Sequence, residues 1–211
     1  MDQESALHTR AYFDEKAAEW DRTMAPKEWE LPRIEQVIGE LEILPGDRVL
    51  DAGCGTGVLF PYLSRHIGAH GHIYALDISS EMLKRARSKC ENGYVRFINS
   101  DVHGFIEEVP ESSFEKIVCF SSFPHFEDDG RLLPAFYRLL SDGGRLLIFH
   151  LQSSLKLNEI HARLPDRHIR SHTLPPVSSL ATRAGTAGFS ILRHEDGSSG
   201  YRLLAEKPPG Q

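Results

Sequence analysis

The stretch Val49-Leu-Asp-Ala-Gly-Cys-Gly-Thr-Gly57 decides the expected fold of this 211-residue chain. A short apolar run is followed by three glycines at alternate positions. A segment whose apolar residues have helical spacing comes directly after them. Glycine permits a sharp turn and lets a ligand approach the backbone without meeting a Cβ atom. Because the loop leads into the positive end of a helix, it also suits a negatively charged group. The stretch therefore predicts a strand, a ligand-binding loop and a helix in succession.

Apolar runs of strand length recur beyond this loop, with helical segments between them. Strands are expected over residues 48–52, 72–78, 95–98, 116–120 and 145–150, and helices over 58–67, 131–140 and 177–187 and after the capping residues Ser79 and Ser80. This alternation predicts a parallel sheet covered on both faces. The runs 190–194 and 201–207 flank a turn-forming segment and predict an antiparallel hairpin. The expected fold class is α/β: a Rossmann-like, seven-stranded, mostly parallel sheet with an antiparallel C-terminal hairpin and helices on both faces.

The first 45 residues do not follow this alternation of strands and helices. They have an amphipathic helical pattern, whose large apolar groups are Tyr12, Phe13, Trp20 and Trp29. We interpret residues 1–45 as a helical lid on one compact domain, residues 46–211. The alternative is an ordinary amphipathic helix docked on the core.

The composition excludes several functional classes. The 24 basic and 30 acidic side chains give a net charge of −6, which disfavours nucleic acid as a partner. No apolar run approaches the roughly 20 residues that a membrane helix needs, and the acidic start Met1-Asp2-Gln3-Glu4 carries no apolar signal segment. The three cysteines, Cys54, Cys90 and Cys119, are scattered and odd in number, which is typical of reduced thiols. We therefore expect a cytoplasmic protein without membrane insertion.

Two kinds of nucleotide-like ligand compete for the glycine loop. A dinucleotide-binding loop has the pattern GxGxxG, but Val58 occupies the position of its third glycine. Asp51 would also lie close to a pyrophosphate and repel it. A carboxylate at this place suits a cationic ligand instead. S-adenosylmethionine (SAM) is such a ligand, because it carries an ammonium and a sulfonium but no phosphate.

Asp51-Ala-Gly-Cys-Gly-Thr-Gly57 resembles the first motif of class I SAM-dependent methyltransferases, and the resemblance extends over residues 47–207. It implies that Asp51 holds the methionine part of the cofactor, Asp77 the ribose hydroxyls and Asp101 the adenine amino group. Glycine-rich turns occur in many α/β proteins, but acids at the ends of three successive strands are harder to explain without this ligand. The residues expected to bind SAM, and S-adenosylhomocysteine (SAH) as its product, are Asp51, Ala52, Gly53, Cys54, Gly55, Thr56, Gly57, Asp77, Ile78, Met82, Asp101, Val102, Phe120 and Ser121.

The methyl acceptor is expected beside the strands that end at Phe120 and His150. Ser122-Phe-Pro-His-Phe126 follows the first of these strands and would face the sulfonium. His125 is therefore the first candidate for a base or for a group that orients the acceptor. Alternatively, His125 is a loop residue that only caps the next helix.

A second cluster of polar residues follows the strand that ends at His150. The polar residues that would share one helical face, at i, i+4 and i+7, are Ser154, Asn158 and His161. The apolar residues expected on the opposite, core-facing side are Leu157, Ile160 and Leu164. A solvated polar face is the alternative reading of this helix. Because the helix begins just after His150, at the ligand-binding edge of the sheet, we favour a pocket.

The histidines of this region, with the preceding Phe123-Pro-His-Phe126, resemble a bacterial branch of the same family. The resemblance implies only that His125, His150, Asn158 and His161 form a polar pocket, and we expect His125, His150 and His161 to be its catalytic residues. The segment Tyr12–Asp21 resembles the N-terminal helix that closes over cofactor and acceptor in ubiquinone- and menaquinone-type methyltransferases. The residues expected to contact the substrate are Tyr12, Phe13, Trp20, Phe123, Pro124 and Asn158.

Imidazoles that converge can also bind a metal ion. His150, His161 and His172 are the candidates, but their spacing matches no compact metal motif and histidine is frequent elsewhere in the chain. No metal is therefore expected. A His-bound metal that holds the acceptor and lowers its pKa is an open alternative.

Together these patterns predict a SAM-dependent methyltransferase that transfers a methyl group in line to a small-molecule acceptor in a histidine-lined pocket. We expect a monomer or a homodimer, with no nucleic acid as partner. Two further alternatives stay open. One is a SAM-binding regulatory or non-catalytic protein, and the other is an RNA methyltransferase that would bind through Arg163, Arg167 and Arg170.

Overall fold

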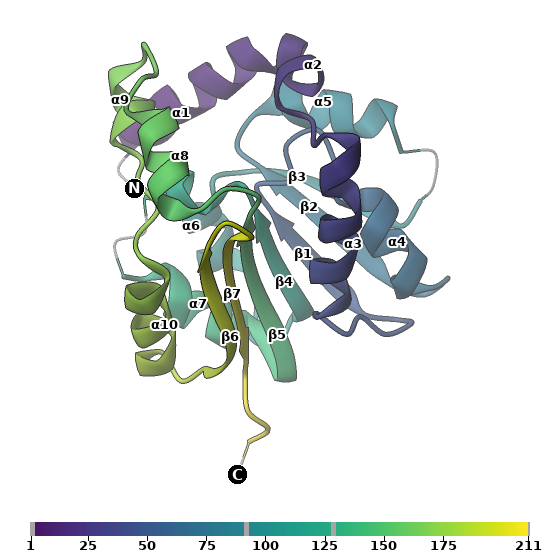
Figure 1. The fold of residues 1–211 in the computed structure, drawn as a ribbon. Coiled ribbons are helices and arrows are strands. Elements are labelled where there is room, and N and C mark those ends of the chain that lie inside the picture. The colour runs from purple at the N-terminus through teal and green to yellow at the C-terminus, as the bar shows by residue number, and fades with distance from the viewer. Residues whose placement is uncertain (1–2, 91–92, 128–129, 211) are drawn as a thin grey trace.

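The strands form one continuous sheet, with the strand that precedes the glycine loop near its centre. The computed structural model describes residues 3–90, 93–127 and 130–210. Its strands are β1 Arg48–Ala52, β2 His72–Asp77, β3 Val95–Asn99, β4 Phe114–Phe120, β5 Leu140–His150, β6 Ser190–Gly197 and β7 Gly200–Glu206. Their order is β3-β2-β1-β4-β5-β7-β6, and β7 runs antiparallel to its neighbours β5 and β6 (Figure 1). The expected seven-stranded, mostly parallel sheet with a C-terminal antiparallel pair is confirmed.

Helices cover both faces of the sheet and one of its edges. They are α1 Gln3–Lys16, α2 Trp20–Met24, α3 Leu31–Gly39, α4 Phe60–Ile67, α5 Ser80–Ser88, α6 Val102–Glu108, α7 Leu132–Leu139, α8 Ser154–His161, α9 Arg167–Ser171 and α10 Val177–Thr186, with short 3₁₀ helices η1 Ala17–Glu19, η2 Glu28–Glu30 and η3 Phe123–Phe126. α3, α4 and α5 pack on one face, and α6, α7 and α10 on the other (Figure 1). α1, α2, α8 and α9 lie over the top edge in that view. None of the described helices combines the length and the apolar character needed to cross a membrane.

The parallel register brings the carboxyl ends of the first strands to this top edge. Asp51 of β1 pairs with Ala75 of β2, and Asp77 at the end of β2 pairs with Asn99 at the end of β3. Because these strands stop together, the residues that follow them share one edge of the sheet, where ligands bind in open α/β folds.

Two elements differ from the expectation. α6 was not expected. It begins after Asp101, whose carboxylate accepts hydrogen bonds from two backbone N–H groups of the first turn. β5 begins at Leu140 instead of residue 145, because Asp142-Gly143-Gly144 lies within the strand, whose register against β4 shifts at this point.

The N-terminal region consists of two parts, a segment that precedes α3 and α3 itself. The side chains of Ile34, Val37 and Ile38 are buried in the core against α4. Neither core cluster of the described residues contains a side chain that precedes Ile34, and in α1 the buried residue is Thr9. α3 therefore belongs with the core, whereas the described residues before it, 3–30, contribute no side chain to either core cluster, and we refer to them as the lid segment.

Candidate active site

A cavity of about 450 Å³ lies at the carboxyl ends of the parallel strands. The glycine loop and the ends of β1, β2 and β4 border it, and α1, α2 and α8 lie above it (Figure 1). The expected site residues that line this cavity are Tyr12, Phe13, Trp20, Asp51, Gly53, Cys54, Gly55, Thr56, Asp77, Ile78, Met82, Asp101, Val102, Phe120, Ser121, His125 and His161. The fold thus brings most of the expected cofactor residues, the lid aromatics and two histidines to one cavity.

Asp51 is the polar group of this cavity that most needs a ligand. Its side chain is buried, with the residue 1% exposed, and its Oδ2 atom has no hydrogen-bond partner among the described residues. Burial, and then the nearby carboxylate of Asp77, raises the pKa of Asp51 to about 8. An ionised carboxylate without a partner is costly in such a place. The site therefore favours a cationic ligand beside Oδ2.

Asp77 is held at the end of β2 by two backbone N–H groups. Gly55 donates to its Oδ2 and Ser79 to its Oδ1, each over 2.8 Å. Burial raises the pKa of Asp77 to about 6, while these two hydrogen bonds oppose the rise. Each carboxylate oxygen keeps a further acceptor position. Asp77 can therefore accept both hydroxyl protons of a ribose.

The backbone of the glycine loop leaves room for a ligand. Gly53 has a φ of +74°, and a Cβ atom there would lie 2.4 Å from Cβ of Ser122. Gly55 has a φ of +52°, and a Cβ atom there would meet no other protein atom within 4 Å beyond its chain neighbours. Because Gly55 lines the cavity, a side chain at this position would project into ligand space.

Asp101 lines the same cavity from the start of α6. Its Oδ1 accepts the N–H groups of His103 and Gly104 over 3.0 and 3.1 Å, which leaves Oδ2 for a further donor. The apolar side chains of Ile78 and Met82 line the cavity as well. A carboxylate oxygen near an apolar slot suits a purine with an exocyclic amino group.

The residues present fit SAM. The unpartnered Asp51 oxygen suits a cationic group, and Asp77 and Asp101 supply acceptors for hydroxyl and amino donors. Among the described residues that line the cavity, Lys27 is the one with a lysine or arginine side chain. A ligand with a pyrophosphate would find too little positive charge here.

His125 lies on η3 in the cavity wall. Its ring meets that of Phe13 edge-on with centroids 5.0 Å apart, and its Nδ1 is 3.0 Å from Nδ1 of His172. Burial lowers the pKa of His125 well below its usual value, and the imidazoles of His172 and His161 lower it further. The ring is therefore neutral at physiological pH, and Nε2 is left for a ligand.

His161, at the end of α8, also lines the cavity. Its Nδ1 is hydrogen-bonded to the carbonyl oxygen of His172. Because a carbonyl oxygen only accepts, Nδ1 carries the proton, and in the neutral ring Nε2 keeps its lone pair. The rings of His125 and His161 have centroids 5.2 Å apart, so both can contact one small acceptor.

His150 does not reach the cavity. It is 1% exposed, its ring lies edge-on to Tyr201 at 5.8 Å, and its Nε2 has no partner among the described residues. Burial, and then the imidazole of His161, lowers the pKa of His150 to about 3. It is a neutral group behind the pocket, and the expectation that it acts on the acceptor is not met.

α8 presents a different side to the cavity from the expected one. The side-chain amide of Asn158 donates to the carbonyl oxygen of Leu174 over 3.0 Å and accepts the N–H of Leu174 over 2.8 Å. Asn158 does not line the cavity. The residues of this segment that do are Leu157, Ile160, His161 and Leu164. The expectation of a polar face toward the acceptor was wrong for Asn158, because helical spacing groups residues on a face but does not tell what that face meets.

Four other expected contact residues lie behind the cavity wall. Phe123 and Pro124 are buried, and Phe123 belongs to the main core. The carbonyl oxygen of Ala52 accepts the hydroxyl of Ser122 over 2.7 Å. Gly57 lies where the loop turns toward α4 with a φ of +82°. These four residues shape the site but do not line the described cavity.

Two acidic residues of the lid were missed by the sequence analysis. Asp14 accepts the hydroxyl of Ser79 over 2.6 Å, and Asp21 accepts the hydroxyl of Thr56 over 2.5 Å. Lys89 also forms an ion pair with Asp21 over 2.6 Å. These contacts fasten the lid to the glycine loop and to α5. The available signal was the seven-residue spacing of these acids within the lid segment.

The sequence patterns also did not predict a cluster of three side chains whose types can bind a metal ion. Glu127, His168 and His172 have ligand atoms within 4.8 Å of one another, whereas His150 and His161 do not belong to this group. The signal in the sequence was the i, i+4 spacing of His168 and His172, which is common for histidine ligands on a helix.

The chain is similar in sequence to known methyltransferases. A family model described as "Methyltransferase domain" matches residues 49–144. The ubiquinone/menaquinone biosynthesis C-methyltransferase UbiE of Vibrio parahaemolyticus is 32% identical over 165 residues, which cover 77% of this chain and 57% of that protein. The chain thus spans a little over half the length of this curated relative.

Solved structures share the fold at low sequence identity. Magnesium protoporphyrin IX methyltransferase (ChlM) from Synechocystis, with bound SAH, has a TM-score of 0.67 and 20% identity and covers 96% of this chain and 98% of its own. The [4+2]-cyclase SpnF has a TM-score of 0.74 and 18% identity, over 98% of this chain and 97% of its own. At these identities the likeness shows the fold alone. The family model over residues 49–144, the UbiE relatives and the acidic glycine loop support the similarity of this chain to class I SAM-dependent methyltransferases.

Proposed function

We propose that the chain transfers a methyl group from SAM to a small molecule that has an apolar body and an O–H or N–H group to be methylated. The buried carboxylate of Asp51, whose Oδ2 has no partner among the described residues, carries this proposal, because Asp51 lines one cavity with two histidines. The activity and the substrate are proposals, since the chain spans only part of its curated relatives.

In this proposal the chain's own residues hold the cofactor at three points. Asp51 faces the charged methionine part, Asp77 accepts the ribose hydroxyls and Asp101 accepts the adenine amino group. SAM supplies the methyl group on a positively charged sulfur. The lid contacts of Asp14 and Asp21 keep α1 and α2 over the cavity, which excludes water from the reacting groups.

The acceptor would lie between the lid and α8. The apolar side chains available to its body are Phe13, Trp20, Leu157, Ile160 and Leu164. A neutral acceptor loses a proton when the new bond to carbon forms, so a proton acceptor must be within reach. Nε2 of His161 has the lone pair for this role, and His125 orients the same group.

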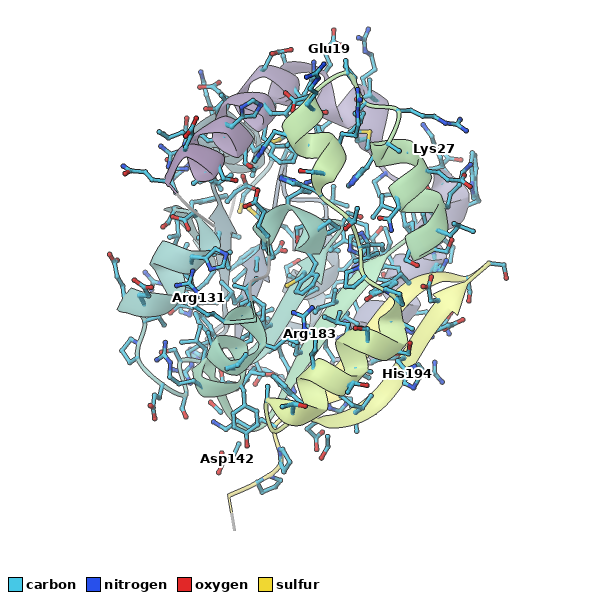
Figure 2. The ribbon with its side chains drawn as sticks, turned by 90° about the vertical axis from the view of Figure 1, so that its left-hand side faces the viewer. Glu19, Lys27, Arg131, Asp142, Arg183 and His194 are labelled. Atoms are coloured by element: carbon cyan, nitrogen blue, oxygen red, sulfur yellow. The ribbon has the colours of Figure 1, made fainter. Side chains whose placement is uncertain are left out.

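The test uses SAM labelled on its methyl group, the purified chain and several cell extracts. We expect label in an extractable small product with the wild type and its loss with Asp77→Asn. Asp142→Asn is the matched control, because Asp142 is an exposed carboxylate at the opposite end of the molecule from the lid residue Glu19 (Figure 2). Label that appears only in RNA or protein would contradict the proposal. Binding of SAM without any labelled product would favour a regulatory protein.

A further inference from the structure

Three side chains of metal-ligand type converge beside the cavity, and the proposed reaction does not use them. Glu127 directly follows η3, whereas His168 and His172 lie four residues apart in α9 and just after it. Nε2 of His172 is 3.1 Å from Oε1 of Glu127, and Nε2 of His168 is 3.5 Å from the same oxygen. All three ligand atoms lie within 4.8 Å of one another.

Two of these separations, 3.1 and 3.5 Å, are close to the edges of a zinc coordination shell. Zinc binds imidazole nitrogen and carboxylate oxygen at about 2.0–2.2 Å, so neighbouring ligand atoms in a tetrahedral shell lie about 3.3–3.5 Å apart. Two histidines at i and i+4 with a carboxylate from elsewhere in the chain form a common donor set for such ions. We propose that Glu127, His168 and His172 bind a divalent transition metal ion of the zinc type.

Three polar atoms approach Oε1 of Glu127. The hydroxyl of Ser5 and Nε2 of His172 are within hydrogen-bond distance of it, whereas Nε2 of His168 lies 3.5 Å away and is hydrogen-bonded to the hydroxyl of Thr9 over 2.9 Å. A metal ion bound to Nε2 of His168 would therefore take the place of its hydrogen bond with Thr9.

The surroundings of the cluster also favour an ion. The side chain of His172 is 2% exposed, and those of His168 and Glu127 are 21% and 30% exposed, so the group is sheltered from water. Glu127 has a left-handed backbone conformation with φ +48° and ψ +58°, which is uncommon for a residue other than glycine. Coordination of its carboxylate would offset the cost of this conformation.

The site lies one side chain behind the cavity. Nδ1 of His172 is 3.0 Å from Nδ1 of His125, which lines the cavity, while the three ligands do not line it. Thr9 of α1 borders the site, with its hydroxyl 2.9 Å from Nε2 of His168. The ion would therefore not hold the acceptor. It would join η3 and α9 next to the lid and fix the ring of His125.

The ion would also determine which nitrogen of His125 carries the proton. A metal on Nε2 of His172 leaves the proton on Nδ1, which then donates to Nδ1 of His125. The proton of His125 is then on Nε2, so His125 presents a donor to the cavity and His161 an acceptor. Without the ion, Nε2 of His172 donates to Glu127, and His125 presents an acceptor instead.

The first test is the metal content of the purified 211-residue chain, produced with zinc and then passed through metal-free buffer without chelator. By elemental mass spectrometry we expect about one ion per wild-type chain and almost none in the double variant His168→Gln/His172→Gln. His194→Gln is the matched control, because His194 is exposed on β6, away from α1 (Figure 2), and this variant keeps the ion. A wild-type chain without transition metal overturns the proposal, as does a double variant with wild-type content.

A second measurement does not depend on how the variants fold. Cobalt(II) is titrated into the wild-type chain after chelator treatment, and we expect visible absorption bands that saturate at about one ion per chain, together with a higher Tm. No bands and an unchanged Tm overturn the proposal. Calorimetric binding of SAH to the same samples reports separately on the cofactor site. A chain that binds SAH but no metal contradicts only the metal site, and one that binds metal but no SAH contradicts only the proposed function.

Discussion

The proposed cofactor half and the proposed acceptor half of the cavity differ in the contacts that position their side chains. In the cofactor half, Asp51 and Asp77 are positioned by strand register and by backbone N–H groups of the glycine loop. In the acceptor half, His125 and His161 are positioned by contacts with His172, which comes from a different segment of the chain. The first arrangement follows from strand register and from the backbone of the glycine loop. The second depends on how η3, α8 and α9 pack against one another.

The largest effect is expected in the acceptor half. His161→Gln removes the proton acceptor and should lower kcat by about 100-fold or more, with the Kd for SAM changed by no more than about two-fold. Steady-state kinetics with the acceptor found by the labelled assay, and calorimetry with SAM, measure both. His103→Gln is the control, because His103 is as buried as His161 and is bonded to a carbonyl oxygen but does not line the cavity. Equal losses of kcat in the two variants would contradict the role of His161.

The next effect belongs to the cofactor half. Asp77→Ala should weaken SAM binding by about 10–100-fold, because charge-assisted hydrogen bonds of about 1.5–3 kcal/mol are lost. Calorimetry with SAM measures the change, and Asp142→Ala should leave the affinity as it is. An unchanged affinity for Asp77→Ala would remove this residue from the cofactor site.

Asn158 is the residue at which the helical pattern and the structure differ. The pattern predicts that its side chain faces the acceptor, whereas in the structure it does not line the cavity. Asn158→Ala leaves the N–H and the carbonyl of Leu174 without their partner and should lower the free energy of unfolding by about 1–3 kcal/mol. Urea denaturation measures this loss, and kcat should fall less than in His161→Gln. A large loss of kcat at unchanged stability would instead show that Asn158 contacts the acceptor.

Asp51 gives the chain without cofactor an unusual pH dependence. Its pKa of about 8 in the folded chain lies above the ordinary 3.8, so between these values the folded state binds more protons and stability falls as pH rises. Asp77, with a pKa of about 6, acts in the same direction but at lower pH. The lowered pKa values of His125 and His150 act in the opposite direction, below the ordinary histidine value of about 6.5.

The window between about pH 6.5 and 8 therefore isolates Asp51. There the free energy of unfolding should fall by at most about 1.4 kcal/mol per pH unit. Urea denaturation across this window should give a flatter profile for Asp51→Asn than for the wild type. Equal slopes would show that Asp51 does not titrate as the geometry requires.

The sequence predicted the sheet and most of the cofactor half because these depend on local rules. The alternation of apolar runs and helices defined the strands, and Asp51, Asp77 and Asp101 line the cavity as the motif implied. The start of β5 was missed, because glycines that normally form a turn lie within an irregular strand.

The acceptor half was predicted less well because no local pattern fixes how a helix is rotated. The i, i+4, i+7 spacing of α8 was real, but Asn158 binds the backbone of Leu174 and apolar residues face the cavity. The end of β5 is at the right edge, yet the ring of His150 points into the core. Glu127 could not be placed near His168 from the sequence, because they are 41 positions apart and meet only through tertiary packing.

The proposed cofactor site depends most directly on the ionisation of Asp51 when the cationic cofactor binds. Calorimetric titration of SAM at pH 7, in buffers that differ in ionisation enthalpy, counts the protons released on binding. For the wild type we expect close to one proton per SAM bound, and for Asp51→Asn almost none. Binding by the wild type without proton release would contradict the account.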